Sequence, residues 1–212
     1  MIRRLIAPFI ALIVGGSVAL SSGCGRNPGG PSPAPTSQVV AFGDSLTFGT
    51  GTTGDNDYVA VLSQRVGVDI HNAGVPGQTT GSALIRLDSS VLARNPKIVI
   101  VLLGGNDLLD SVPLQTRVNN ITAIVQRIRG SSAAVLLVGL GKPPIDPFDG
   151  ALPTLASGTG STYVPDILEG IFGVPSLMAD FIHPNNAGHA IMADRLEPAL
   201  RVALAAIPPG GY

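Results

Sequence analysis

The stretch 39-VVAFGDSLTFGTG-51 places an uninterrupted apolar run directly before Gly-Asp-Ser. Four consecutive apolar residues, 39–42, are typical of a strand that is covered on both faces, as the strands of a parallel sheet are. Parallel sheets of α/β proteins carry their functional sites at the carboxyl ends of the strands. Ser45 therefore stands where an attacking hydroxyl would lie, although an ordinary turn also places serine after a strand.

Apolar runs of the same kind recur along the chain and predict the rest of the sheet. The other candidate strands are residues 68–74, 98–103, 133–140 and, doubtfully because of Pro165, 162–168. Apolar residues at steps of three and four predict helices between them. One of these helices ends at Gly130, and the last begins behind Pro184, a residue type favoured in a first helical turn. Alternating strands and helices predict a three-layer, doubly wound α/β domain.

The composition fits one folded enzyme domain and excludes several other classes of protein. The chain has 212 residues, of which 45% are hydrophobic and only 13% charged, so it can bury a sizeable core. A formal net charge of −1 offers no basic surface for nucleic acid. Three histidines and a single cysteine cannot build a His/Cys metal cage, and that cysteine has no partner for an internal disulfide. We therefore expect no metal and no nucleic-acid partner.

The N-terminus has the pattern of an export signal. Arg3 and Arg4 precede an apolar run, and small residues follow it, so residues 1–23 are predicted to be a signal peptide. The sequence 20-LSSGC-24 resembles the lipobox of bacterial lipoproteins, in which the cysteine carries the lipid, although Ser21 stands where that pattern prefers leucine. Cys24 is thus the predicted lipidation site. Ordinary secretion and a retained membrane anchor are the alternatives.

The rest of the chain divides into a tether, a domain and a tail. Residues 24–37 are rich in proline, glycine and serine, which extend rather than pack, so they predict a tether. Residues 38–207 form the predicted domain, and residues 208–212 a C-terminal tail. We expect an exported protein anchored in the membrane through its lipid and facing the periplasm or the cell exterior, or otherwise periplasmic or secreted.

Polar clusters at the predicted strand ends would meet at one edge of the sheet. Asp180 and His183 lie three residues apart, which on a helical turn makes their side chains neighbours. A carboxylate there can orient one imidazole nitrogen and leave the other to face Ser45. Pro184 biases His183 away from helical geometry and places it at a loop–helix junction. Either feature alone is usually a cap or a surface pair, but together they point to nucleophilic catalysis.

Acyl transfer also needs donors for a developing oxyanion. Gly74 has no Cβ and could bring its backbone N–H close to a substrate. Asn106 could offer its side-chain amide, and Ser45 its own N–H. The plainer interpretation is that these residues only make β–α turns. Asp44 and Asp107 are expected to support the loops by accepting hydrogen bonds from backbone N–H groups.

Four blocks together resemble the SGNH (GDSL-type) hydrolases in order and spacing: GDSL at 43–46, NAG at 72–74, GGND at 104–107 and DFIHP at 180–184. The resemblance spans residues 38–206 and is greatest to the small periplasmic thioesterase, lysophospholipase and arylesterase type. It implies a flavodoxin-like sheet of five strands and cleavage of carboxylic (thio)esters through an acyl-enzyme. It also implies roles for individual residues: the nucleophile Ser45, the base His183, its partner Asp180, and an oxyanion hole of Ser45, Gly74 and Asn106.

The expected partner is a small-molecule or lipid ester, with no cofactor and a monomeric chain. A carbohydrate O-acetyl esterase with the same triad is an alternative, and so is an inactive surface-binding lipoprotein, although no triad member is missing. The segment 49-GTGTTG-54 matches a dinucleotide fingerprint literally. It lacks the helix directly after the strand and the acidic residue at the end of the next strand that this fingerprint requires.

One region departs from the family pattern. Residues 142–179 are dense in proline and glycine, where related enzymes usually carry a long substrate loop and a well-formed helix. We expect at best a short helix here and a truncated wall for the acyl chain. A truncated wall predicts a preference for short acyl groups. The alternative is that Ile171, Phe172, Val174, Leu177 and Met178 form a replacement wall.

Overall fold

The computed structural model describes residues 38–141 and 147–208. They form a five-stranded, all-parallel sheet in the order β2-β1-β3-β4-β5. The strands are β1 Val39–Gly43, β2 Ile70–Gly74, β3 Ile98–Leu102, β4 Ala134–Val138 and β5 Thr162–Val164. This confirms the predicted fold class, and it shows that the doubtful fifth strand exists as three residues that end before Pro165. Cys24, the signal peptide, the tether and residues 209–212 lie outside the described residues.

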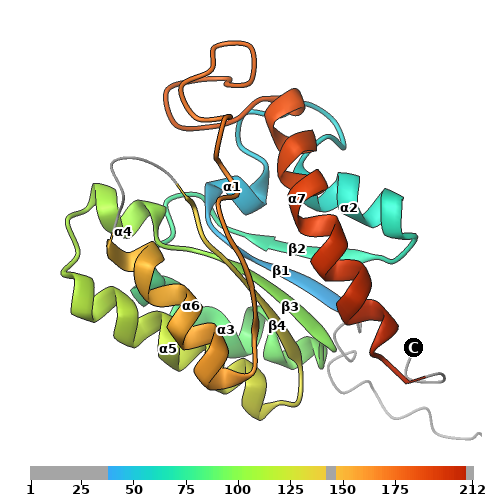
Figure 1. Ribbon diagram of the computed structural model, residues 1–212, viewed down its shortest axis with the longest axis vertical. Coiled ribbons are helices and arrows are strands. Elements are labelled where there is room, and N and C mark those ends of the chain that lie inside the picture. Colours follow the sequence, from blue (N-terminus) through green and yellow to red (C-terminus); the bar gives the residue numbers. More distant parts are fainter. Residues whose placement is uncertain (1–37, 142–146, 209–212) are drawn as a thin grey trace, which may run out of the picture. The chain divides into compact units, whose positions relative to one another are not determined.

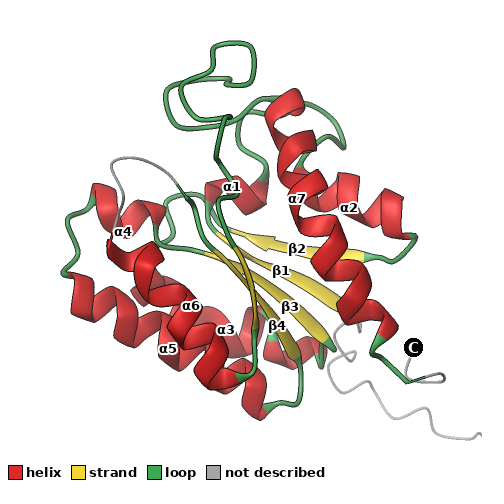
Figure 2. Cartoon of the chain, viewed as in Figure 1, coloured by secondary structure: helices red, strands yellow, loops and turns green. Residues whose placement is uncertain are grey.

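Helices cover both faces of the sheet, and two shorter helices follow β1 and β3. Helices α2 and α7 lie on one face, and α3, α5 and α6 lie on the other (Figure 1, Figure 2). The helices are α1 Ser45–Phe48, α2 Tyr58–Val66, α3 Thr80–Ser90, α4 Gly105–Leu109, α5 Leu114–Gly130, α6 Pro147–Thr159 and α7 Asn186–Ala205. The predicted end of α5 at Gly130 is confirmed.

The apolar runs are uninterrupted because each strand has a helix layer on either side. In β3, Ile98 and Ile100 belong to the core beneath α2 and α7. Val99 and Val101, which alternate with them, belong to the core beneath α3, α5 and α6. All four side chains are completely buried. Two such cores leave the polar residues of the sheet at the strand ends, where the site is found.

Two expectations about the helices are wrong. Helix α6 has 13 residues in the region expected to hold at best a short helix, and Pro153 lies inside it. Phe148, Leu152 and Ala156 recur at steps of four and bury one face, which outweighs the lost backbone hydrogen bond at the proline. Helix α7 begins behind Pro184, as predicted, but Pro184 lies outside its first turn. It begins after Asn185, whose side chain accepts hydrogen bonds from the backbone N–H groups of Ala187 and Gly188.

Candidate active site

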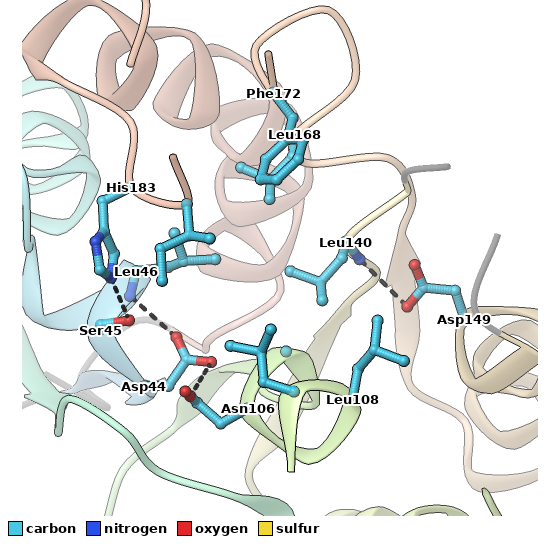
Figure 3. Close-up of a pocket in the computed structure, with 13 residues that line it drawn as sticks. Asp44, Ser45, Leu46, Asn106, Leu108, Leu140, Asp149, Leu168, Phe172 and His183 are labelled. Carbon is cyan, nitrogen blue, oxygen red and sulfur yellow. Dashed lines mark hydrogen bonds between the residues drawn. The ribbon is translucent and has the colours of Figure 1, made fainter. Parts of the chain in front are cut away.

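Ser45 is the first residue of α1, directly after the turn that ends β1. Asp44 caps this four-residue helix, and its Oδ1 accepts a hydrogen bond from the N–H of Leu46 at 3.0 Å. Gly43 makes the tight turn possible, because a Cβ there would lie 2.1 Å from Thr47 Oγ1 and 2.6 Å from the carbonyl oxygen of Leu102. The turn from β1 into α1 therefore leaves no room for a side chain at position 43. Ser45, which follows this turn, points into a pocket (Figure 3).

His183 and Asp180 lie in the loop before α7, where His183 contacts Ser45 and Asp180 contacts His183. The distance from Ser45 Oγ to His183 Nε2 is 3.1 Å, and His183 Nδ1 lies 2.8 Å from Asp180 Oδ2. A carboxylate can only accept here, so in the neutral imidazole Nδ1 carries the proton and Nε2 is the acceptor for the Ser45 hydroxyl. The structure thus brings together the three residues predicted to form a triad.

The Asp180–His183 pair is made in a tight loop and not on a helical turn. Asp180 Oδ1 accepts hydrogen bonds from the N–H groups of Ile182 and His183, both at 2.8 Å. The hydrogen bond with the His183 ring, followed by these two backbone bonds, lowers the pKa of Asp180 to about 2. Asp180 is consequently ionised at neutral pH, and half of its side chain is exposed.

The three predicted oxyanion donors come from three different elements. Ser45 begins α1, Gly74 ends β2, and Asn106 lies in α4. The N–H of Gly74 donates to Asn72 Oδ1 at 2.9 Å, and a second bond, from Asn72 Nδ2 to the Thr47 carbonyl at 2.7 Å, ties that side chain to α1. The structure gives a packing reason for glycine at position 74. A Cβ there would lie 2.2 Å from the backbone nitrogen of Phe48, so β2 and α1 could not pack together.

Asn106 lies between Asp44 and the segment before α3. Its Nδ2 lies 3.2 Å from Asp44 Oδ2 and 3.1 Å from the carbonyl oxygen of Gln78, so it can donate to both (Figure 3). Asp44 is only 2% exposed, and burial raises its pKa to about 6. Asp44 therefore connects two parts of the site: the turn that holds Ser45, and the side chain of Asn106.

Asp107 is completely buried and connects α4 to the start of α3. Its carboxylate accepts from the N–H of Thr80 at 2.7 Å and from the Thr80 hydroxyl at 2.6 Å. Asn120 of α5 donates to the same hydroxyl oxygen at 3.1 Å. This network fixes the helix that carries Asn106 and does not itself reach the pocket.

The pocket beside Ser45 and His183 is mainly apolar. Its apolar wall consists of Leu46, Leu108, Leu109, Leu140, Leu168, Phe172 and Ile182. Leu168 and Phe172 come from the region expected to lack a wall. Asp149 of α6 lines the far side, where its carboxylate accepts from the N–H groups of Leu140 and Gly141 (Figure 3). Leu140 and Asp149 could not be predicted as site residues, because no local sequence pattern connects α6 to the end of β4.

The other histidines lie away from the triad's hydrogen bonds. His189 is completely buried on α7, where its Nδ1 accepts from the N–H of Tyr58, and burial lowers its pKa to about 4. His71 lies within β2. Gly51 of the segment 49–54 packs against the triad loop, since a Cβ there would lie 2.4 Å from the carbonyl oxygen of Pro184. Within residues 38–141 and 147–208, no group of three or more potential His, Cys, Asp or Glu ligands could hold a metal ion.

The sequence and the fold both resemble those of known proteins. Residues 41–191 match the model of the GDSL-like lipase/acylhydrolase family. Esterase TesA of Pseudomonas aeruginosa is 31% identical over 178 residues, which cover 78% of this chain and 89% of TesA. Thioesterase 1/protease 1/lysophospholipase L1 of Escherichia coli K12 is 27% identical over 172 residues, 77% and 83% of the two chains. A crystal structure of TesA superposes with a TM-score of 0.71 at 30% identity, covering 78% of this chain and 98% of that one.

One shorter match is to a protein that is named as a lipoprotein. The uncharacterized lipoprotein YqeF of Bacillus subtilis is 40% identical over 77 residues, 32% of this chain and 31% of YqeF. Among the described residues, no helix combines the length and the apolar character that a membrane span requires.

Proposed function

The chain belongs to the GDSL-like lipase/acylhydrolase family and is an enzyme that acts on ester bonds; on this premise we propose that it is a serine esterase using Ser45, His183 and Asp180. The observation that carries the proposal is the continuous series of contacts from Asp180 Oδ2 to His183 Nδ1, 2.8 Å, and from His183 Nε2 to Ser45 Oγ, 3.1 Å. These are hydrogen-bonding distances for a nucleophile, its base and the group that orients the base.

The reaction proceeds through an acyl-enzyme. Ser45 Oγ attacks the carbonyl carbon of the ester while its proton passes to His183 Nε2. The tetrahedral intermediate then collapses, the bond to the leaving alcohol or thiol breaks, and that group takes the proton from His183. Water then attacks the carbonyl carbon of the acyl-enzyme and passes a proton to His183 Nε2. The second tetrahedral intermediate collapses, the bond from the acyl carbon to Ser45 Oγ breaks, the carboxylic acid leaves, and Ser45 Oγ takes the proton from His183. Asp180 stays ionised throughout and stabilises the imidazolium.

The oxyanion is stabilised by Ser45 N–H, Gly74 N–H and Asn106 Nδ2. The last two donate to Asn72 Oδ1 and Asp44 Oδ2 in this structure. A fully charged oxyanion competes well against neutral acceptors, which are Asn72 Oδ1 for the N–H of Gly74 and the carbonyl oxygen of Gln78 for Asn106 Nδ2, because charge-assisted hydrogen bonds are about twice as strong as neutral ones. Losing one such donor costs about 10²–10³ in kcat, so Asn106→Ala should lower kcat by that factor.

The apolar wall supports an amphiphilic acyl ester or thioester as substrate. The expected preference for short acyl groups rested on a missing wall, but Leu140, Leu168 and Phe172 line the pocket. Each methylene that leaves water contributes up to about 0.8 kcal/mol. Four methylenes that are only half buried would raise kcat/KM by roughly tenfold. We therefore propose a preference for acyl chains of medium length over acetyl groups.

The test is a series of p-nitrophenyl esters from two to twelve carbons, each below its micelle concentration. We expect kcat/KM of the wild-type protein to rise with chain length and Phe172→Ala to flatten the rise without changing the rate on acetate. Val202→Ala is the matched control, because Val202 is 73% exposed on α7 and does not line the pocket. A rate that is highest for acetate would contradict the proposed substrate class, and Ser45→Ala checks the nucleophile in the same assay.

The protein is further proposed to be exported and anchored through a lipid on Cys24. The similarity to a protein named as a lipoprotein supports this, as does the sequence 20-LSSGC-24. Cys24→Ser should release the enzyme from the membrane fraction or leave it unprocessed. Ser21→Leu, which restores the preferred lipobox residue, should keep it membrane-bound. A wild-type protein that fractionates wholly as a soluble enzyme would exclude the anchor.

A further inference from the structure

The three proposed oxyanion donors belong to separate elements, yet they must converge on one oxygen atom. Catalytic groups have to be held within about 0.5 Å of the productive geometry. Ser45 follows β1, Gly74 ends β2, and Asn106 lies beyond β3. The pairing of β1 and β2 reaches Gly43 and Gly74, but β2 is an edge strand that is paired on one side only, and Asn106 lies outside the sheet. A side chain that contacts several of these segments at once could hold them in place.

Arg86 of α3 contacts the carboxyl ends of both β1 and β2. Its Nη2 donates to the carbonyl oxygen of Ala73 at 2.9 Å and to that of Gly43 at 3.1 Å. The guanidinium carbon lies 4.4 Å from the centre of the Phe42 ring, a cation–π contact that fixes the plane of the group. The carbonyl oxygen of Gly43 also accepts from the N–H of Val75 at 3.1 Å, so β1 and β2 share an acceptor where they end.

The contact with Ala73 acts directly on a proposed donor. The carbonyl group of Ala73 and the N–H of Gly74 belong to the same planar, trans peptide group and point in opposite directions. Holding the carbonyl oxygen therefore sets the direction of the N–H. A cationic donor on the oxygen also polarises the peptide group and strengthens the hydrogen bond that the N–H makes.

The same guanidinium also reaches Asn106 through one intermediate residue. Arg86 Nε donates to the side-chain oxygen of Gln78, and Gln78 Nε2 donates to Ser82 Oγ at 2.9 Å. The side chain of Gln78 is thus held from both ends, and its backbone carbonyl oxygen is an acceptor for Asn106 Nδ2 at 3.1 Å. Among the described residues, no carboxylate lies within ion-pair distance of Arg86, so its charge is offset mainly by backbone carbonyl dipoles.

We propose that Arg86 is a positioning residue of the oxyanion hole, which holds the Ala73–Gly74 peptide group, the turn before Ser45 and the segment that contacts Asn106. The inference rests on the proposed function, because it presupposes that these groups bind an oxyanion. Arg86 does not line the pocket and touches no reacting atom. Its effect is on the tetrahedral intermediate, which carries the oxyanion, and not on the binding of the uncharged ester.

The experiment compares Arg86→Met, Arg86→Lys and a matched control in the full-length protein. Arg127→Met is the control, because Arg127 is a surface arginine of α5 that pairs with Asp88 outside the site. The assay measures kcat and KM on a medium-chain p-nitrophenyl ester and the Ki of a trifluoromethyl ketone with the same acyl chain. That ketone forms a tetrahedral oxyanion adduct with a reactive serine.

We expect Arg86→Met to lower kcat by about 30- to 100-fold with KM within about threefold, and to raise Ki by a similar factor, somewhat less than loss of a donor itself. Arg86→Lys should recover part of the loss in kcat and part of the loss in inhibitor affinity. A lysine ammonium can reach one carbonyl oxygen, but it cannot contact Ala73, Gly43 and Gln78 together as the guanidinium does. In an Asn106→Ala background, the effect of Arg86→Met should shrink, since one of its targets is gone. Arg127→Met should change neither constant.

A folded Arg86→Met protein whose kcat and Ki stay within twofold of wild type would overturn the proposal, whatever its melting temperature. If that variant does not fold, Gln78→Leu removes the hydrogen bonds of the Gln78 side chain to Arg86 and Ser82 and leaves the contacts of Arg86 with the carbonyl oxygens of Ala73 and Gly43 in place. A fall in kcat of about fivefold or more with unchanged KM then supports the proposal, and an unchanged kcat overturns it. Failure of the proposed function looks different: Ser45→Ala would remain active, or the ketone would not inhibit the wild-type protein.

Discussion

The two halves of the proposed triad are built in opposite ways. The nucleophile segment, residues 43–47, is embedded in the fold, with Asp44 2% exposed and Thr47 completely buried. In the acid–base loop, residues 179–184, the first four residues are exposed, with Phe181 97% and Ile182 44% accessible to solvent. One catalytic contact, from His183 to Ser45, joins these two environments.

The interactions that hold the two segments differ accordingly. The nucleophile segment is fixed by distant parts of the chain: Thr47 Oγ1 hydrogen-bonds the Tyr58 hydroxyl at 2.9 Å, and Asn72 donates to the Thr47 carbonyl. The acid–base loop is fixed largely by itself, through Asp180 and a hydrogen bond from the N–H of Ala179 to the His183 carbonyl at 2.8 Å. Substitutions of the buried residues in the first segment therefore test fold and chemistry together, whereas those of exposed residues in the loop test chemistry alone.

The two segments also shift the pKa of the same residue type in opposite directions. Burial raises the pKa of Asp44 to about 6, and hydrogen bonds lower that of Asp180 to about 2. Asp180 can therefore stay ionised beside an imidazolium. The pKa of Asp44 lies close to neutral pH, so Asp44 would be a poor permanent anion. Environment, and not residue type, separates the role of an orienting carboxylate from that of a structural one.

The largest expected effect is at the point where the two segments meet. Ser45→Ala removes the attacking oxygen, and a triad acts as a unit, so kcat should fall by at least about 10⁴-fold. Ser45 is partly exposed, so the free energy of unfolding should hardly change. Turnover of a medium-chain p-nitrophenyl ester and a urea unfolding curve check both statements. Retained activity would remove Ser45 from the mechanism.

The next effect separates chemistry from folding within the exposed loop. Asp180→Asn should lower kcat by about 10³- to 10⁴-fold, because the imidazole loses both its orienting acceptor and the charge that stabilises the imidazolium. Since Asp180 is half exposed and the amide oxygen can still accept the two loop N–H bonds, the melting temperature should stay close to wild type. Asp55→Asn, on the exposed loop before α2, is the control and should have neither effect. A large loss of stability would show that the loop is not self-contained.

The third prediction uses the raised pKa of the buried aspartate. A carboxyl whose folded pKa of about 6 exceeds its ordinary 3.8 stabilises the fold when protonated, so its contribution is lost as the pH rises from about 4 to 6. Two pKa units correspond to about 3 kcal/mol. Asp44→Asn removes this titration and should gain that free energy of unfolding, relative to wild type, between pH 4 and pH 7.

The measured quantity has to be the difference between the two proteins. His189, with a pKa lowered to about 4, works in the other direction, because its contribution is lost as the pH falls below about 6. Asp180 loses its contribution only below its ordinary pKa of 3.8, outside this window. Urea unfolding at intervals of half a pH unit gives the difference. A difference that does not vary with pH would mean that Asp44 does not titrate in this range.

The strands could be predicted from the sequence, but helix α6 could not. The strands follow from runs such as 98–103, because burial on both faces leaves a signature in consecutive residues. Helix α6 was missed because Pro153 and the glycines around it suggested a loop, although Phe148, Leu152 and Ala156 carried the helical spacing. Tertiary burial outweighed the local preference.

The site was predictable where its chemistry is concentrated in short motifs, and not where it depends on tertiary contacts. Ser45, His183 and Asp180 belong to two short motifs, GDSL at 43–46 and DFIHP at 180–184, whose residue types indicate hydrogen-bonding chemistry. Arg86 stands in the middle of an ordinary amphipathic helix, and nothing around it signals that its side chain reaches two strand ends. Leu140 and Phe172 likewise line the same pocket only because the fold brings the segment after β4 and the segment after β5 together there.

The smallest expected effect distinguishes two adjacent residues of the acid–base loop. Ile182 lines the pocket and is 44% exposed, whereas Phe181 is 97% exposed and does not line it. Ile182→Ser gives up roughly 1 kcal/mol of contact with an acyl chain, which corresponds to about a fivefold loss in kcat/KM on a medium-chain ester. Phe181→Ser removes the larger apolar group but should change that constant by less than about twofold, because little of its surface leaves water in the fold. Both variants should keep the wild-type rate on an acetyl ester. If Phe181→Ser proved the more damaging on the longer chain, the acyl group would have to lie across the outside of the loop and not in the pocket beneath it.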